Sequence, residues 1–179
     1  MNTPDDAQPP LGLDQRSVRL RPYTARWAEL YEVEARAIRS ALGARALDVQ
    51  HVGSTAVPGM TAKPILDIAV GIATLDEFRL CMAPLAQLGY EHAHWAGLQN
   101  NEVFGKGVDR THLVHVVQHG GPVWNDYLRF RNLLRSQAET ARAYQQLKLA
   151  LSQRYADNRA AYTESKHAFI RGLLDAQPS

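Results

Sequence analysis

The chain has 179 residues, about the size of one domain, which is long enough to bury a hydrophobic core. Hydrophobic residues make up 45% and charged residues 21% of it, a composition that excludes disordered and fibrous proteins. A net charge of +2 is too small to indicate a nucleic-acid-binding protein, so we expect no nucleic acid, and an anionic partner should be small.

The sequence carries no signal for export or for insertion into a membrane. Residues 1–10 contain two aspartates and three prolines but no basic start or apolar run, and no stretch approaches the roughly 18 consecutive apolar residues of a spanning helix. The single cysteine, Cys81, excludes an internal disulfide, and its apolar neighbours favour inert packing. We therefore expect a cytoplasmic protein without membrane contact, with a disordered tail over residues 1–15 and a single domain over residues 16–176.

The first predicted elements alternate between strands and a helix. Ser17–Arg21 alternates apolar and polar residues, which predicts a short strand, and Thr24–Leu42 has apolar residues at helical spacing up to the stop at Gly43. Leu47–Val52 is predicted as a strand, and the nearly unbroken apolar run Pro64–Ile72 as an interior strand covered on both faces.

The next elements are a helix and a hairpin. Thr74 and Glu77 form a capping box for a helix that ends near Gly89 and that Pro84 should kink or split near Cys81. Glu102–Gly107 and Thr111–Gln118 are predicted as two strands joined by a turn.

The last third of the chain is predicted to be helical. Pro122 opens one helix, Ser136 and Glu139 form a capping box for a second that continues to about Tyr155, and a final helix carries Phe169 to Leu174. Mixed strands and helices followed by helices alone predict an α+β fold, with a mixed sheet, flanking helices and a helical C-terminal layer.

The loop Gly53-Ser54-Thr55 is a candidate phosphate site. A strand that ends in Gly-Ser exposes backbone amides and a hydroxyl where the chain turns, and such turns bind phosphate oxygens well. The alternative is that Gly53 and Ser54 only form a tight turn.

Asp67 is the second candidate, because a carboxylate in the middle of an interior strand is costly unless a cation, a metal or a hydrogen-bond donor compensates it. A buried salt bridge with Lys63 or with an arginine is the structural alternative to a functional role.

Here the sequence resembles a known family. Gly53-Ser54 at a strand end, followed by an acidic residue on the next strand, is similar to the active-site signature of the nucleotidyltransferase superfamily. With His51, the Ala56-Val57-Pro58-Gly59 turn and Lys63-Pro64 added, the segment resembles the GrpB-like family. Further similar segments extend the resemblance over about Val18–Ile170: Arg21-Pro22-Tyr23, Trp27, Leu88-Gly89-Tyr90, Lys106-Gly107, Arg110-Thr111-His112, His115-Val116-Val117, Phe130-Arg131, Tyr144, Leu147-Lys148, Tyr162-Thr163 and Lys166.

The resemblance implies a nucleotidyltransferase-like fold, with Asp67 as a catalytic residue and as a ligand of Mg²⁺. Active members of the superfamily carry two carboxylates at positions i and i+2, which share one face of the strand and hold divalent metal. Position i+2 is Ala69 here, so the carboxylate set is incomplete.

Histidines could fill part of that gap. His115 lies on a predicted neighbouring strand and is the second candidate catalytic residue, while His51 could approach from the other side. His112 and His115 are three apart on an extended chain, so only one of them can face Asp67. The alternative is that a histidine on an apolar strand is a hydrogen-bonded core residue.

Basic residues are the remaining candidates for binding an anion. All four lysines of the chain fall in the family-like segments, and Lys148 and Lys166 could face the Gly-Ser turn across a cleft, although exposed lysines are often only solvated. The expected substrate-binding residues are His51, Gly53, Ser54, Thr55, Lys63, Arg110, Arg131, Lys148 and Lys166. Four aromatic residues could stack on a base, although core packing is the commoner role: Trp95, Trp124, Tyr144 and Tyr162.

Three functions remain open at this stage. The first is binding of a nucleoside triphosphate with Mg²⁺ and transfer of a nucleotidyl group to a small acceptor. The second is a non-catalytic module for a nucleotide or phosphorylated small molecule, motivated by Ala69. The third is hydrolysis at one transition metal held by Asp67, His51 and His115.

Overall fold

The computed structural model describes residues 11–93 and 99–176 and confirms the α+β fold class. One five-stranded sheet has the strand order β1-β2-β5-β4-β3, with β2 and β5 parallel and the other neighbours antiparallel. The strands are β1 Asp48–Val52, β2 Leu66–Ile72, β3 Tyr90–His92, β4 Glu102–Lys106 and β5 His112–Gln118.

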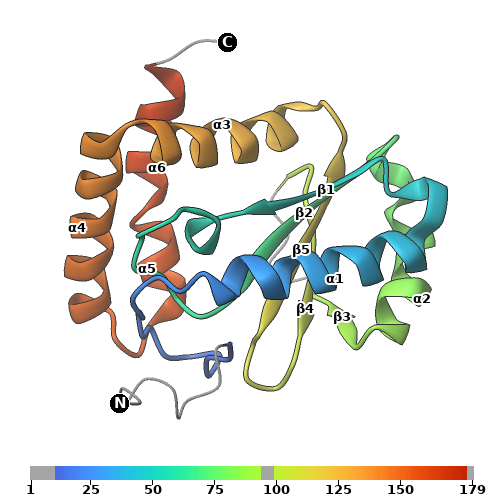
Figure 1. Cartoon of the computed structure of the whole chain (residues 1–179), viewed down its shortest axis with the longest axis horizontal. Helices are drawn as coiled ribbons and strands as arrows, with labels where there is room; N and C mark the ends of the chain where they lie inside the picture. Colours follow the sequence, from blue (N-terminus) through green and yellow to red (C-terminus); the bar gives the residue numbers. More distant parts are fainter. Residues whose placement is uncertain (1–10, 94–98, 177–179) are drawn as a thin grey trace.

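Helices cover both faces of the sheet, and a helical layer stands at one end (Figure 1). Helices α1 and α2 pack on one face, α3 packs on the other, and α4, α5 and α6 form the end layer. The α-helices are α1 Arg26–Leu42, α2 Arg79–Gln87, α3 Pro122–Ser136, α4 Ala138–Arg154, α5 Arg159–Glu164 and α6 His167–Asp175, and the short 3-10 turns are η2 Gly43–Arg45, η3 Ser54–Ala56 and η4 Leu75–Phe78.

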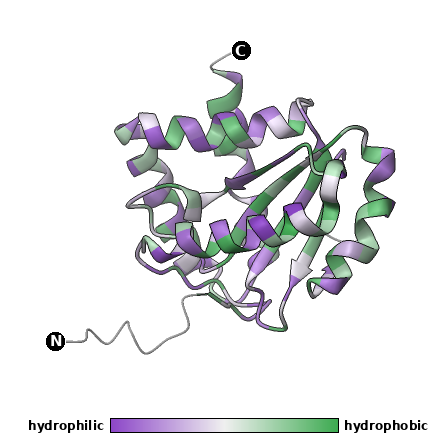
Figure 2. Cartoon of the chain, turned by 45° about the vertical axis from the view of Figure 1, so that its right-hand side comes forward, coloured by the Kyte–Doolittle hydropathy of each residue, from purple (hydrophilic) through white to green (hydrophobic). Residues whose placement is uncertain are grey.

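The main core lies between the sheet and the pair α1 and α2. It contains Trp27 and Ile38 from α1, Leu85 from α2, and Ile68 and Phe104 from the sheet, each at most 1% exposed. The predicted interior strand is confirmed, because β2 lies between β1 and β5 and all of its residues except Asp67 are buried. Figure 2 shows hydrophobic residues concentrated on the central strands, whereas the helices carry both hydrophobic and hydrophilic residues.

Most elements of the first two thirds follow the sequence patterns. The helix predicted over Thr24–Leu42, the strand ending at Val52 and the hairpin of β4 and β5 are confirmed. The strand predicted over Ser17–Arg21 is wrong, because in this segment only Arg21 pairs with a strand-like neighbour, Ala62, and the Val18 amide donates to the carbonyl of Ala156. The start of this segment is therefore hydrogen-bonded to the C-terminal helical layer and not to the sheet.

The helix after Thr74 differs from its prediction. It starts as η4 and continues as α2, so the change of geometry comes at Phe78 and Arg79, while Pro84 sits inside α2. The side chain of Thr74 makes no capping hydrogen bond. The short strand β3, which follows Gly89, was not predicted.

The C-terminal helices are confirmed as a layer, but their boundaries differ. Gln137, and not Ser136, precedes α4, because the Ser136 hydroxyl donates to the carbonyls of Asn132 and Leu133 at the end of α3. The final helix is confirmed as α6, and the short helix α5 before it was not predicted. In the predicted tail, Leu13 is buried and pairs with Arg110, so residues 11–15 pack on the domain.

Gly71 sets how closely α3 approaches the sheet. A Cβ at this position would lie 2.8 Å from the His119 ring and 3.0 Å from the ring of Trp124, which packs α3 against β2. We expect Gly71→Ala to lower the free energy of unfolding by about 1–3 kcal/mol, since α3 must shift to admit the methyl group. Urea unfolding followed by circular dichroism measures the change.

Gly172→Ala is the matched control for that substitution. Gly172 lies in α6 with no atom within 4 Å of a built Cβ, so alanine there should leave stability unchanged or raise it by up to about 1 kcal/mol. Equal effects at the two glycines would contradict the packing described for Gly71.

Candidate active site

Asp67 is the second residue of β2 and points to the face of the sheet that carries α3. Strand alternation places Ala69 on the same face, while Ile68 points into the main core. Pairing aligns Asp67 with Val52 of β1 and Leu113 of β5. The Asp67 side chain keeps 32% of its surface accessible, so a ligand can reach the carboxylate.

The structure brings the Gly-Ser turn against this carboxylate. Gly53 has φ +70° and ψ −172°, a conformation that is essentially restricted to glycine. A Cβ at Gly53 would lie 2.9 Å from the Asp67 Cβ and closer still to Oδ2, so any side chain there would collide with Asp67. The turn therefore needs glycine for its backbone and for the space beside the carboxylate.

A chain of hydrogen bonds holds the other oxygen of Asp67. His115 Nε2 lies 3.4 Å from Asp67 Oδ1, and His115 Nδ1 lies 3.1 Å from the hydroxyl of Tyr127 on α3. The Asn101 side-chain amide donates to the same hydroxyl at 2.8 Å. If Asp67 is ionised, His115 donates a hydrogen bond to it from Nε2 and accepts one from the Tyr127 hydroxyl at Nδ1. All hydrogen bonds of this series then point toward Asp67.

Ala69 occupies the position next to His115. The two residues are paired across β2 and β5, and Ala69 is fully buried on the α3 face. The imidazole of His115 thus stands beside the place where a second carboxylate was expected. In this arrangement His115 contacts the Asp67 carboxylate through Nε2 and so restricts its orientation.

The other two histidines turn away from Asp67. His51 pairs with Ile68, points into the opposite face and stacks on Tyr31 with ring centroids 4.6 Å apart. Burial lowers the pKa of His51 to about 4, so its imidazole is neutral at pH 7. His112 also faces that side, which confirms that only one of His112 and His115 can face Asp67.

The three-ligand transition-metal site is therefore not formed. His51 and His115 lie on opposite faces of the sheet, and among residues 11–93 and 99–176 no group of three or more histidine, cysteine or acidic side chains could hold a metal ion. Asp67 is thus a lone carboxylate, and a Mg²⁺ ion held by it would need further ligands such as water or substrate phosphates.

The hydroxyls of the turn are both engaged within the protein. Thr55 is 2% exposed and its Oγ1 lies 3.0 Å from His51 Nε2, so this hydroxyl faces the core. Ser54 is partly exposed and hydrogen-bonds with Tyr144 of α4. Of the two predicted donors, Ser54 is the one that stands at the surface of the turn.

Lys63, Lys166 and Arg159 lie close enough to Asp67 for its charge to act on them, and Lys148 lies next to Lys166. Lys63 and Lys166 lie over the ring of Tyr162, with Nζ 5.3 Å and 4.4 Å from its centroid. Lys148 is 1% exposed, donates to the carbonyl of Thr61 and lies over Tyr144. The fourth cation, Arg159 at the start of α5, was missed because a single arginine in a helical stretch has no signature in the sequence.

These cations act on the carboxylate. Burial raises the pKa of Asp67, but the hydrogen bond from His115, together with the nearby Lys63 and Lys166, outweighs burial and holds the pKa below its usual value. Asp67 is therefore an anion at neutral pH. We call Asp67, Gly53, Lys63, Lys166 and Arg159 the Asp67 site.

The two predicted arginines occupy different places. Arg110 is buried, and its guanidinium group lies on Gly105 of β4. Gly105 pairs with Leu113 of β5, and Leu113 pairs with Asp67 of β2, so all three residues share one face of the sheet. Arg110 is thus two strands away from the carboxylate. Arg131 donates to the Gln50 side chain and to the His51 carbonyl, so its contacts join α3 to β1.

The predicted aromatic residues are core residues where the structure describes them. Trp124, Tyr144 and Tyr162 are at most 4% exposed, and Trp95 lies outside the described residues. Tyr144 and Tyr162 contribute through their rings, which contact the three lysines, and not as stacking surfaces for a base.

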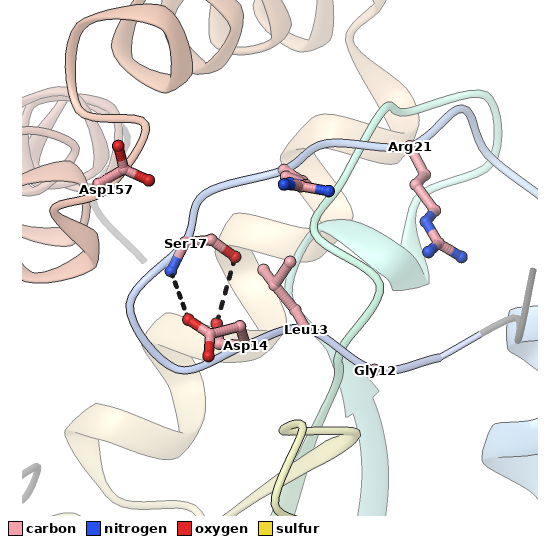
Figure 3. A pocket seen from close by; sticks show the side chains of 7 residues that line it. Gly12, Leu13, Asp14, Ser17, Arg21 and Asp157 are labelled. Carbon is pink, nitrogen blue, oxygen red and sulfur yellow. Dashed lines mark hydrogen bonds between the residues drawn. The ribbon is translucent and has the colours of Figure 1, made fainter.

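A surface hollow of about 410 Å³ lies elsewhere, between the N-terminal segment and the residues before α5 (Figure 3). The amide and the hydroxyl of Ser17 both donate to Asp14 there, to its side chain and to its carbonyl. The residues that line it are Gly12, Leu13, Asp14, Ser17, Arg19, Arg21 and Asp157, and none of them belongs to the Asp67 site.

Comparison with known proteins identifies the family. A family model described as GrpB protein matches residues 17–176. The chain belongs to the GrpB family. It is 32% identical over 171 residues to the glutamate-rich protein GrpB of Alkalihalophilus pseudofirmus, which covers 92% of this chain and 98% of that protein. The family that the sequence motifs indicated is thereby confirmed.

Solved structures support the same family. The crystal structure of conserved protein GrpB from Enterococcus faecalis has a TM-score of 0.79 and 34% identity, over 87% of this chain and 94% of that chain. A cytoplasmic RNA terminal U-transferase matches with a TM-score of 0.43 and 11% identity, over 72% and 43%, a similarity too small to carry an argument about activity. Within the described parts of this GrpB protein, no helix is long and apolar enough to cross a membrane.

The contact between Gly53 and Asp67 can be tested by a double-mutant cycle. We expect Gly53→Ala to destabilise the protein by more than the roughly 1–3 kcal/mol that such a sparsely populated conformation costs by itself, because the methyl group also collides with Asp67. Asp67→Ala in the same chain should restore part of the loss, with a coupling energy of about 0.5–3 kcal/mol.

Gly59→Ala serves as the control for backbone strain. Gly59 has φ +77° but no atom within 4 Å of a built Cβ, so its substitution reports the conformational cost without a collision. Additive effects of Gly53→Ala and Asp67→Ala in urea unfolding would show that the turn and the carboxylate are not in contact.

Proposed function

We propose that this GrpB protein binds a nucleoside triphosphate with Mg²⁺ at the Asp67 site and transfers a nucleotidyl group to a small acceptor. The observation that carries the proposal is the charge of the site, where a single accessible carboxylate stands beside a glycine turn among Lys63, Lys166 and Arg159. A triphosphate is an anion that matches such an excess of positive charge.

The carboxylate suits a metal ion that arrives with the nucleotide. Mg²⁺ commonly binds one or two carboxylates together with substrate phosphates. His115 holds Oδ1 of Asp67 and Oδ2 lies against the Gly53 turn, so the carboxylate that would hold the metal is fixed in orientation. Bound Mg²⁺ would neutralise charge on the phosphates during the reaction.

The transfer step would form a bond between an acceptor oxygen and the α-phosphorus and break the bond from that phosphorus to the β-phosphate oxygen. Pyrophosphate leaves, and the proton of the acceptor hydroxyl passes to solvent or to a base. Lys63, Lys166 and Arg159 would stabilise the leaving pyrophosphate through its charge. The acceptor in this proposal is a small molecule with a nucleophilic hydroxyl or similar group.

A second candidate function is binding without catalysis. It is favoured by Ala69, which removes one of the two carboxylates that hold the metals in active nucleotidyltransferases. Release of pyrophosphate from a bound nucleotide distinguishes the two functions, because a binding module releases none.

Calorimetric titration with ATP, GTP, CTP and UTP, each with and without Mg²⁺, tests the proposal. We expect at least one nucleotide to bind, and Asp67→Asn to weaken its binding by about tenfold or more when Mg²⁺ is present. Without Mg²⁺ the same substitution should not weaken binding, because it removes a negative charge that repels the phosphates.

Asp109→Asn is the matched control, since Asp109 is exposed in the turn between β4 and β5 and belongs to no part of the Asp67 site. Failure of all four nucleotides to bind at millimolar concentration, with or without Mg²⁺, would exclude the proposal.

A further inference from the structure

The imidazole of His115 and the carboxylate of Asp67 lie side by side at the accessible face of the sheet. His115 pairs with Ala69, the residue two positions after Asp67 on the same face. Nε2 of His115 lies 3.4 Å from Oδ1 of Asp67, which is about the separation of two neighbouring donor atoms that each lie roughly 2.1 Å from one metal ion. The His115 side chain keeps 14% of its surface accessible and that of Asp67 keeps 32%, so an ion can reach both.

One imidazole nitrogen next to one carboxylate oxygen is a donor set with its own metal preference. Mg²⁺ prefers oxygen ligands, whereas imidazole binds transition-metal ions. Mn²⁺ shares the preference of Mg²⁺ for carboxylate oxygens and, as a transition-metal ion, gains more from a nitrogen ligand. The pair therefore suits Mn²⁺ better than Mg²⁺.

Binding of a metal ion through Nε2 requires that the neutral imidazole of His115 carries its proton on Nδ1. Metal-binding histidines commonly donate this second N–H to an oxygen atom. The Tyr127 hydroxyl lies 3.1 Å from Nδ1, and the side-chain amide of Asn101 lies 2.8 Å from that hydroxyl. Tyr127 can therefore accept from Nδ1, provided that its own proton has an acceptor.

The Asn101 amide can supply that acceptor, because nothing holds its other end. Asn101 is 3% exposed, and its Oδ1 has no hydrogen-bond partner in the parts of the chain that the structure describes. A half-turn of the amide brings Oδ1 to the Tyr127 hydroxyl and breaks no hydrogen bond at the opposite end. An unpartnered buried oxygen calls for an explanation, and a reversible series of hydrogen bonds provides one.

Reversal of the series depends on a cation. The hydrogen bonds then run from Nδ1 of His115 through Tyr127 to Asn101, and the lone pair of Nε2 faces the Asp67 carboxylate. These two groups repel each other unless a positive ion lies between them. The reversed arrangement is thus stable only when a metal ion is bound, and the imidazole stays neutral in both arrangements.

We propose that His115 and Asp67 together hold the divalent ion of the Asp67 site, and that the site therefore prefers Mn²⁺ to Mg²⁺. His115 takes the place of the carboxylate that Ala69 lacks. The inference rests on the proposed function and specifies its metal and a second protein ligand. Tyr127 and Asn101 orient the imidazole and do not contact the ion.

Electron paramagnetic resonance of Mn²⁺ added to the protein tests this assignment, with Mn²⁺ alone and with Mn²⁺ plus tripolyphosphate. Tripolyphosphate replaces the nucleotide because it contains no nitrogen. We expect the spin-echo modulation of bound Mn²⁺ to show coupling to an imidazole nitrogen, which requires direct ligation. Loss of the free Mn²⁺ signal gives the affinity, and competition with Mg²⁺ gives the preference.

His115→Gln distinguishes a metal ligand from a residue that only orients Asp67, because the glutamine amide can still donate to the carboxylate but offers no imidazole. We expect this variant to lose the nitrogen coupling and to bind Mn²⁺ about tenfold or more weakly, with a clearly smaller loss for Mg²⁺. Tyr127→Phe should also weaken Mn²⁺ binding by about tenfold, since it removes the acceptor for Nδ1.

His119→Gln is the matched control. His119 is exposed just after β5, and its amide donates to the carbonyl of Ile72 at the other end of β2 from Asp67. This variant should keep both the nitrogen coupling and the affinity for Mn²⁺.

The outcomes separate this inference from the function on which it rests. Bound Mn²⁺ without nitrogen coupling, coupling that His115→Gln retains, or equal losses of Mn²⁺ and Mg²⁺ binding in that variant would overturn the inference and leave nucleotide binding intact. Absence of Mn²⁺ binding with and without tripolyphosphate would overturn it too, whereas the proposed function fails only if all four nucleotides also do not bind. If His115→Gln does not fold, the coupling in the unsubstituted protein and in His119→Gln decides.

Discussion

The attraction between the Asp67 carboxylate and the cations around it is the interaction on which the site depends. Asp67 acts on Lys63, Lys166 and Arg159, which come from the connection before β2 and from the C-terminal helical layer. The charge of the carboxylate thus attracts that helical layer to the end of the sheet. Gly53 must remain small to leave space for it, and His115 fixes its orientation.

A buried acid elsewhere in the same protein shows what a purely structural carboxylate looks like. Glu34 on α1 accepts hydrogen bonds from Tyr90 and Lys106 and lies 3.9 Å from His112, so its charge is met by direct partners. Asp67 has one weak direct partner and several cations further away. The excess of positive charge distinguishes the Asp67 site from a closed internal network, and an anionic ligand would complete it.

The sequence patterns predicted the framework of this site more reliably than its details. Hydrophobic periodicity was sufficient for α1, β1, β2 and the hairpin, and alternation along β5 placed His112 and His115 on opposite faces. The inward turn of His51 and Thr55 depends on the register between β1 and β2, which no local pattern specifies.

Residues contributed by distant elements could not be predicted. Tyr127, Asn101 and Arg159 reach the site only because α3, the segment before β4 and α5 pack around the sheet. The same packing directs Arg131 to β1, although its sequence context resembles that of an anion-binding residue. Tertiary contacts of this kind leave no trace in local sequence, whereas periodicity and glycine positions do.

A crystal structure of the protein with a non-hydrolysable ATP analogue and Mg²⁺ tests the central claim most directly. The account predicts electron density for the phosphates between the Gly53 turn and the side chains of Lys63, Lys166 and Arg159, with the metal at the Asp67 carboxylate. Phosphates bound at the hollow beside Asp14 and Arg19, with the Asp67 site unchanged, would contradict it.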